Sequence, residues 1–468
     1  MDVHILFQIR HSLREYDMAS DYLDRLAEFV TSTNWADLDS STIDAAKKVV
    51  LDTLGAILLG SRMKENANLA QLVRNLSGQG RASLIGHKGR VQPVFAALVN
   101  ATAGVAQEMD EGTRLGGGHP SIHVTPGAIA VGEELGKSGR EVLESIIIGY
   151  EVTSRVGSGT RVKPEVHSHG TWGTIGAAAA TARLLGFDQA QTRQTMNLAM
   201  SMSPANTWTP CLEGATIRNL YPGRSGFQGI MAAYLSRCGF TGVKDGPSDL
   251  YGSILGEGFD QEAVVAGLDE RGKFRIQQNY FKLHACCLYN HPVLDAVQNL
   301  IDREGFQGSD VDHIQVEAPP IVQIMANPEP ENMLSAKFSI PYAVAALVLR
   351  GVTDITAFYP EEVAEPSVRA LARRVKVTSD PEMTLRRYDY PSARVTVVLK
   401  DGRNLKESVT SQHGDFSNPA SDEELLAKFA RLSFDSLGEE RTQIVADTVY
   451  RMDELADVRE LTSLLGEV

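Results

Sequence analysis

Residues 97–127, ALVNATAGVAQEMDEGTRLGGGHPSIHVTPG, hold the most informative pattern in this chain. The small apolar residues at its start predict a closely packed, buried helix that ends at Met109-Asp110. Three glycines at 116–118 then allow backbone conformations closed to other residues, and His119-Pro120 leads into the next helix. An acid, a flexible loop and a base within ten residues favour proton transfer. Alternatively, Asp110 and His119 only satisfy local hydrogen bonds at a helix end, and this stretch alone leaves both interpretations open.

Four further polar clusters each precede a predicted helix. Helix N-termini present unpaired N–H groups and a partial positive charge, so such loops attract carboxylates. Their His, Arg, Lys and Tyr side chains therefore indicate a small polyanionic ligand. The clusters are HSHGTWG at 167–173, GATIRNLYPGR at 214–224, YFKLHACCLYNHP at 280–292 and AKFSIPYA at 336–343.

Taken in order, the five segments resemble the MmgE/PrpD family, which contains 2-methylcitrate dehydratase, cis-aconitate decarboxylase and iminodisuccinate epimerase. The similarity runs from about Ala19 to near the C-terminus. The resemblance implies two domains with the active site between them, and commonly a homodimer. The motifs that carry it are ALVNATA with MD and GHPS, H-x-x-G-T-x-G, R-x-L-Y-x-G, FK with CC and H, and FS-x-P-Y.

The hydrophobic periodicity predicts a mainly α protein with an inserted α+β domain. We expect a large helical domain formed by both chain ends and a smaller α+β lid domain. The predicted boundaries are an N-terminal extension at 1–18, a helical domain at 19–270, the lid at 271–410 and a return to the helical domain at 411–468.

Local signals refine this prediction. Capping boxes are expected at Ser41, Ser138 and Ser421, and Gly60 and Gly157 are expected to end helices. Within the lid, alternating patterns predict strands in FRIQQNYF, HIQVEAP, RVKVTSD and ARVTVVLKDGRNLKESVT, with a hairpin turn at Asp401-Gly402 and helices around 292–303, 335–350 and 365–373.

The composition excludes several classes of protein. The 468 residues carry a formal charge of −14, which disfavours nucleic acid and anionic membranes as partners. The most apolar stretch, residues 49–60, contains Asp52 and is too short to span a bilayer. Four cysteines in so long a chain do not make a disulfide framework, so we expect a cytoplasmic protein.

We predict neither a metal nor an organic cofactor. His119-x-x-x-His123 has the spacing of helical metal ligands, but Pro120 and Pro126 argue against a regular helix across both histidines. Gly136-Lys137-Ser138 mimics the end of a P-loop, yet residue 131 is Val where the first glycine belongs.

The resemblance implies four catalytic residues. Asp110 is the expected base or proton-positioning group, and His119 matches the histidine of the H-P-S element. His167 falls on the family histidine, although a shift of two residues would exchange it with His169. Lys282 has no acidic neighbour within four residues and is expected either to bind a carboxylate or to transfer a proton.

Six further residues are expected to bind substrate. Arg218 stands where the decarboxylases carry a lysine that binds a carboxylate, and Arg224 either assists it or forms a salt bridge. Cys287 replaces a histidine thought to donate a proton in the decarboxylases. The others are Thr113, in a loop one residue shorter than in those enzymes, His291, which could equally be a helix cap, and Tyr342, which could equally be a buried tyrosine.

The family's reactions start at a bond beside a carboxylate, so they need fixed cations, a base and an acid. We therefore expect a cofactor-independent hydro-lyase acting on a small di- or tricarboxylate, in the manner of 2-methylcitrate dehydratase. The alternative is an epimerase of an amino-dicarboxylate such as iminodisuccinate. A decarboxylase or a catalytically silent carboxylate-binding protein fits the residues less well.

Overall fold

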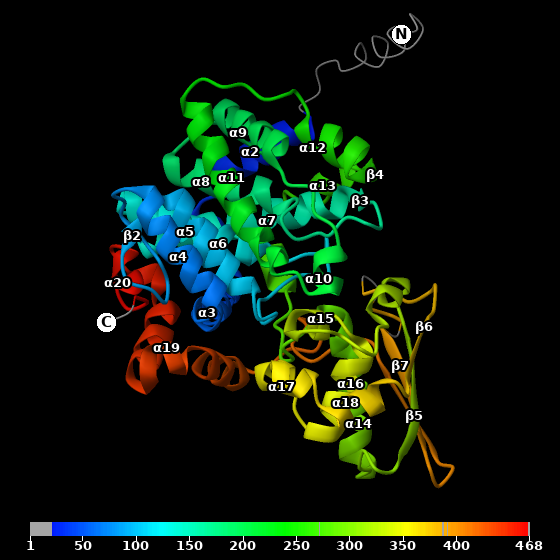
Figure 1. Ribbon diagram of the computed structural model, residues 1–468. Coiled ribbons are helices and arrows are strands. Elements are labelled where there is room, and N and C mark those ends of the chain that lie inside the picture. Colours follow the sequence, from blue (N-terminus) through cyan, green and yellow to red (C-terminus); the bar gives the residue numbers. More distant parts are fainter. Residues whose placement is uncertain (1–20, 271, 386–387, 391, 467–468) are drawn as a thin grey trace, which may run out of the picture.

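The computed structural model describes residues 21–466 except 271, 386, 387 and 391. Figure 1 shows a mainly helical part built from both ends of the described chain beside a smaller α+β part. The predicted fold class is therefore confirmed, whereas the predicted extension at 1–18 lies outside the described residues. Within those residues, no helix combines the length and the apolar character needed to cross a membrane.

Small side chains let the helices of the larger part pack closely around α5 (Pro93–Val105). Gly223 of α11 (Leu220–Arg237) faces Leu98, and a Cβ on that glycine would lie 2.3 Å from the Leu98 carbonyl oxygen. The two helices thus touch through their backbones.

The other helices of this part are α2 (Tyr22–Ser32), α3 (Ser40–Ser61), α4 (Lys64–Ser77), α6 (Pro120–Leu135), α7 (Gly139–Gly159), α8 (Gly173–Leu185), α9 (Gln189–Met202), α10 (Thr209–Glu213), α12 (Gly246–Asp249), α13 (Gln261–Val265), α19 (Asp422–Tyr450) and α20 (Arg459–Thr462). Two short antiparallel pairs, β1 (Ala82–Ser83) with β2 (Arg90–Val91) and β3 (Thr160–Val162) with β4 (Gly256–Phe259), lie among them.

The C-terminal return is made by α19, which packs along α3 and bends at Gly438, where φ is +73°. Capping boxes at Ser138 and Ser421 start α7 and α19, as predicted. The box predicted at Ser41 is wrong. Asp39 is the N-cap of α3 instead, and its carboxylate accepts a hydrogen bond from the Thr42 N–H at 2.7 Å.

The two predicted helix ends, Gly60 and Gly157, lie one and two residues before the ends of α3 and α7, whereas the argument against a helix through Pro126 is wrong. Gly60 lies within α3, and Gly157 lies within α7, where a Cβ would come within 2.7 Å of Trp172 Nε1. His119 is the N-cap of α6, and the helix continues through Pro126, which removes one N–H donor without ending it.

The α+β part is a four-stranded sheet in the order β6-β5-β7-β8, with helices packed on it (Figure 1). Strand β5 (Val311–Ala318) runs parallel to β6 (Val375–Ser379) and antiparallel to β7 (Ala393–Leu399). The predicted hairpin at Asp401-Gly402 joins β7 to β8 (Asn404–Val409). The helices of this part are α14 (His291–Glu304), α15 (Met333–Lys337), α16 (Ile340–Arg350), α17 (Pro360–Val363) and α18 (Pro366–Ala372).

Two predictions for this part are wrong in detail. The segment FRIQQNYF forms a 3-10 helix at Arg275–Gln278, because Phe274 and Ile276 pack into the core of the helical part and do not join a strand ladder. The helix expected at 335–350 is two helices. Ser339 separates them and caps α16, with its hydroxyl accepting from the Tyr342 N–H at 3.1 Å.

The chain passes from the helical to the α+β part along the glycine-rich loop. Tyr280 and Gly112 exchange two backbone hydrogen bonds, of 2.8 and 3.1 Å. On the other side of the same segment, the Phe281 N–H donates to the Gly414 carbonyl at 2.8 Å. This pairing fixes Lys282, the next residue but one after Tyr280, beside the loop that carries Asp110.

The buried carboxyl group of Glu111 holds the loop between Asp110 and His119 in place. Glu111 accepts hydrogen bonds from the Ser121 N–H at 2.8 Å and the Tyr150 hydroxyl at 3.1 Å. Burial, aided by the charge of Asp52, raises the pKa of Glu111 to about 8. The folded protein therefore keeps a proton on Glu111 at neutral pH.

We expect Glu111→Gln to flatten the dependence of stability on pH. Between pH 4.5 and about 8 the folded protein holds a proton that the unfolded chain releases, so wild-type unfolding free energy should fall as pH rises, by up to about 1.4 kcal/mol per pH unit. Glutamine keeps the shape of the protonated acid and removes this slope. Urea denaturation at pH 5, 6.5 and 8 would measure it, with Glu439→Gln on the exposed face of α19 as the control. Equal slopes in all three proteins would contradict a protonated Glu111.

Candidate active site

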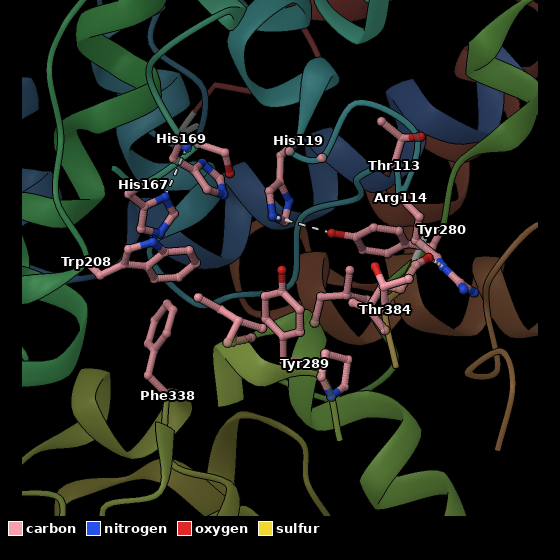
Figure 2. Close-up of a pocket in the computed structure, with 18 of the residues that line it drawn as sticks. Thr113, Arg114, His119, His167, His169, Trp208, Tyr280, Tyr289, Phe338 and Thr384 are labelled. Carbon is pink, nitrogen blue, oxygen red and sulfur yellow. Dashed lines mark hydrogen bonds between the residues drawn. The ribbon is translucent and has the colours of Figure 1, made fainter. Parts of the chain in front are cut away.

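A cavity of about 420 Å³ lies between the two parts of the molecule (Figure 2). The helical part contributes the loop that precedes α6, the histidines at 167 and 169, Trp208, and Arg218 in the 3-10 turn Thr216–Asn219 before α11. The α+β part contributes four segments, which lie at 287–289, 319–321, 338 and 383–385. The lining side chains include Glu108, Thr113, Arg114, His119, His167, His169, Trp208, Arg218, Tyr280, Cys287, Tyr289, Phe338, Met383, Thr384 and Leu385.

Asp110 and His119 form one unit, as their proximity in sequence suggested. His119 Nδ1 lies 2.9 Å from Asp110 Oδ2 and 2.6 Å from the Glu111 carbonyl oxygen. Two acceptors at Nδ1 require the proton there, which leaves Nε2 as the basic nitrogen. Nε2 points toward the Tyr280 hydroxyl at 3.4 Å, as Figure 2 shows. His119 can therefore present a base to the cavity, with Asp110 in contact with the other nitrogen of its ring.

The Asp110 carboxylate stays ionised. Its complete burial would raise its pKa, but the charges of Lys282 and His119 outweigh burial and hold the pKa far below the usual range. Asp110 is thus a poor proton acceptor in its own right and a good partner for a protonated His119.

Lys282 has acidic partners that the sequence did not reveal. Its ammonium donates to Glu108 Oε2 at 2.9 Å and Asp110 Oδ1 at 3.2 Å, and its side chain is fully buried. Burial works against its charge, but the two carboxylates raise the pKa of Lys282 above its usual value. Lys282 is not among the residues that line the cavity. It lies behind Glu108 and Asp110 and holds them in place.

Arg218 is the cation at the cavity surface. Its Nη2 lies 2.5 Å from Glu108 Oε1, and its guanidinium packs 5.3 Å from the centre of the Phe338 ring. The arginine is only 1% exposed. Burial would lower its pKa, but the charge of Glu108 raises it, so the guanidinium is charged.

Two neutral histidines, His167 and His169, line the cavity beside Trp208. The His169 ring stacks on His119 with 4.0 Å between centroids, and the His167 ring stacks on Trp208 at the same distance. Burial and nearby positive charges lower the pKa of both His167 and His169 well below the usual value. His123, from α6, accepts a hydrogen bond from the Gly170 N–H at 2.8 Å and so fixes the loop that carries them.

The six predicted substrate-binding residues fall into two groups. Thr113, Arg218 and Cys287 line the cavity, whereas Arg224, His291 and Tyr342 do not. Arg224 hydrogen-bonds to the Asn206 side chain. His291 Nε2 lies 3.3 Å from the Cys286 carbonyl oxygen, and the Tyr342 hydroxyl donates to the Ala357 carbonyl at 2.6 Å. The last two therefore have the structural roles that the sequence had left open for them.

Several cavity residues were missed. Glu108 stands two positions before Asp110, and an acid just after the run of small apolar residues that ends at Ala106 was the signal available for it. His169 was set aside in favour of His167, and both face the cavity. Tyr280 and Trp208 had no local signal, because their place depends on contacts far away in the sequence.

A metal ion fits this site poorly. Ligand atoms of Asp110, His119 and His169 lie within 4.8 Å of one another, a different grouping from the His119 and His123 spacing that the sequence analysis argued against. Yet the Lys282 ammonium already lies 3.2 Å from Asp110, and the Arg218 guanidinium is part of the same cluster. A dication would have to bind beside two fixed cations. That the protein uses no metal stays a prediction.

Comparison with known proteins places this arrangement in a family. Residues 24–253 match the MmgE/PrpD N-terminal domain, and residues 284–452 match the MmgE/PrpD C-terminal domain. Among curated proteins, the chain is 27% identical to a cis-aconitate decarboxylase of Mus musculus over 92% of this chain and 90% of the relative. It is 24% identical to a cis-aconitate decarboxylase of Aspergillus terreus over 92% and 93% of the two chains. With both domain models matched in order across most of its length, the chain belongs to the MmgE/PrpD family.

Proposed function

We propose that this protein is a cofactor-independent lyase that removes a proton beside a carboxylate of a small di- or tricarboxylate, as 2-methylcitrate dehydratase does. The family and the named relatives support an enzyme of lyase type. The observation that carries the proposal is the His119 Nε2 atom, which faces the cavity while Nδ1 contacts Asp110 and the Glu111 carbonyl. By resemblance to the family, we also propose that the protein acts as a homodimer in the cytoplasm.

The proposed reaction begins with Arg218. Its guanidinium binds a substrate carboxylate, and His119 Nε2 takes the proton from the neighbouring carbon. The electrons of that C–H bond move toward the carboxylate, whose growing charge Arg218 stabilises. They then form a C=C bond as the C–O bond to a hydroxyl on the next carbon breaks. Protonated His119 returns its proton to the leaving group, which departs as water. Tyr280, with its hydroxyl 3.4 Å from Nε2, can relay that proton.

Decarboxylation is the second candidate, because the named relatives are cis-aconitate decarboxylases. Cys287 argues against it. By resemblance, the decarboxylases carry a proton-donating histidine at this position. Burial raises the pKa of the Cys287 thiol to about 12, so the thiol is a weak acid.

A panel of di- and tricarboxylates in deuterated water separates the candidates. Alkene formation with loss of water would support the hydro-lyase. Release of carbon dioxide would show a decarboxylase, and deuterium exchange without a new product would point to the epimerase considered from the sequence. No reaction with any member of the panel would contradict the proposed function.

We expect Asp110→Asn and His119→Ala to abolish turnover to a similar degree. The double variant should be little worse than either single one, because both groups serve one step. Turnover and thermal stability should be measured on all three variants. If Asp110 were only a local cap, its loss would cost roughly 1 kcal/mol of stability and leave turnover nearly intact. Cleanly additive effects on turnover would rule out the shared role.

Lys282→Ala should reduce both activity and stability. From the sequence, Lys282 has no acidic neighbour within four residues, which suggested a role in the chemistry and none in stability. The ion contacts to Glu108 and Asp110 reverse that expectation. Breaking a buried ion cluster typically costs about 3–5 kcal/mol, because a charge is left without a partner. Chemical denaturation would measure the loss, with the exposed Lys273→Ala as control. A variant with unchanged stability would mean that the cluster does not support the fold.

Arg218→Lys should not be neutral, because lysine keeps the charge but loses the planar pair of donors. We expect kcat/KM to fall by roughly tenfold or more, the size of one charge-assisted hydrogen bond. Arg224→Lys is the matched control, since Arg224 hydrogen-bonds to Asn206 and does not line the cavity. Greater damage from the Arg224 change would show that the roles of the two arginines are reversed.

A further inference from the structure

Glu108 occupies an unusual place in the cavity wall. It lines the cavity, yet it is only 1% exposed. Its two carboxylate oxygens face different cations, with Oε1 2.5 Å from Arg218 Nη2 and Oε2 2.9 Å from Lys282 Nζ. Burial would raise its pKa, but Arg218 and Lys282 lower it, so the side chain is a carboxylate.

The backbone at Glu108 is strained. Its φ is +55°, and among the described residues it is the only one other than glycine with a positive φ. Side chains with a Cβ disfavour this left-handed region. Glycine or asparagine would suit the turn better, so the turn itself does not explain an acid here. Such strain at a cavity wall points to a side chain that is held in place for function.

One oxygen of Glu108 still lacks a hydrogen bond. Oε2 accepts from the Lys282 ammonium, whereas Oε1 has the ion contact with Arg218 Nη2 at 2.5 Å but accepts no hydrogen bond among the described residues. A buried carboxylate oxygen without a donor is costly. Since Glu108 faces the cavity, a ligand can supply that donor.

The charges around Glu108 cancel. The carboxylates of Glu108 and Asp110 balance the cations of Arg218 and Lys282. Arg114, a further cation in the cavity lining, lies 3.5 Å from Asp415 and stacks on Tyr388. The two arginines of the cavity lining, Arg114 and Arg218, therefore each have an acid partner, and Arg218 stands beside Glu108. These pairs leave no surplus of positive charge for a ligand that carries only carboxylates.

We propose that Glu108 determines specificity by accepting a hydrogen bond from a hydroxyl or amino group on the substrate, next to the carboxylate that Arg218 binds. A donor on the carbon beside a carboxylate necessarily lies close to whatever cation holds that carboxylate. Because Arg218 and Glu108 are in contact, a substrate carboxylate bound by Arg218 would place a donor on its neighbouring carbon close to Glu108. The inference rests on the proposed function, because it takes Arg218 as the site of the substrate carboxylate.

The test compares three dicarboxylates with the same carbon skeleton: succinate, without a donor, malate, with a hydroxyl, and aspartate, with an ammonium group. Calorimetry on the wild-type protein should show malate or aspartate binding about tenfold or more tightly than succinate, the size of a hydrogen bond to a charged group. Equal binding of all three to the wild type would overturn the proposal, and this result needs no variant.

Glu108→Gln removes the charge and keeps the shape of the side chain. It should strengthen succinate binding and weaken aspartate binding, so that the preference for aspartate is lost or reversed. Malate separates the charge of Glu108 from its hydrogen bond. If the variant still prefers malate over succinate, the change in aspartate binding comes from the lost charge. If the variant loses this preference, the hydrogen bond to Glu108 is responsible. Glu133→Gln is the matched control, a buried glutamate that bonds to Ser83 and Thr462 away from the cavity.

Equal changes for all three ligands in Glu108→Gln would mean that Glu108 only positions the cations, and would overturn the proposal. These measurements use binding alone. If the donor preference appears while Asp110→Asn retains full turnover, the proposed proton transfer fails and the role of Glu108 stands. If a hydroxy-tricarboxylate is dehydrated while binding shows no donor preference, the proposed function stands and the role of Glu108 fails.

Discussion

Four charged side chains share a volume from which water is nearly excluded, and the rest of the site depends on their balance. Glu108, Asp110, Arg218 and Lys282 are each at most 1% exposed. An isolated charge at such depth would be strongly unfavourable, so each one requires the other three. Lys282 comes from the segment that leads into the α+β part, whereas the other three belong to the helical part. The balance of charge therefore also sets how the two parts meet.

This balance defines the chemistry of the cavity. Because Asp110 is held ionised by Lys282, it orients the imidazole of His119 and does not compete with it for a proton. Because His167 and His169 are kept neutral, the part of the cavity wall that they form adds no cation. In the proposed reaction, His119 is thus the base next to the pair of Arg218 and Glu108. Selectivity in so enclosed a space comes from matching donors to acceptors, since a buried polar group that stays unpaired is penalised.

The sequence predicted the outline of the protein well, because the outline depends on local rules. Hairpin turn residues, two capping boxes and the change from a helical to a strand period lie within a few residues of the elements they specify. The failures involve partners that are distant in sequence. Lys282 meets Glu108 and Asp110 across more than 170 positions, and no pattern around Lys282 signals them. Residues 274–281 alternate as a strand does, but the partners of Phe274 are core side chains of the helical part.

The α+β part leaves the helical part and returns to it at one place. Phe281 on the outgoing segment and Gly414 on the returning one are joined by a backbone hydrogen bond, and Tyr280 pairs with Asp415. These two adjacent, hydrogen-bonded segments make a short and well-defined junction between the inserted α+β part and the helical part. An α+β part from another member of the family could be exchanged here by matching only these two segments. Because Lys282 lies just beyond the junction, the exchange would carry one charge of the buried cluster with it, and only modules with a cation at that position would be compatible with the host.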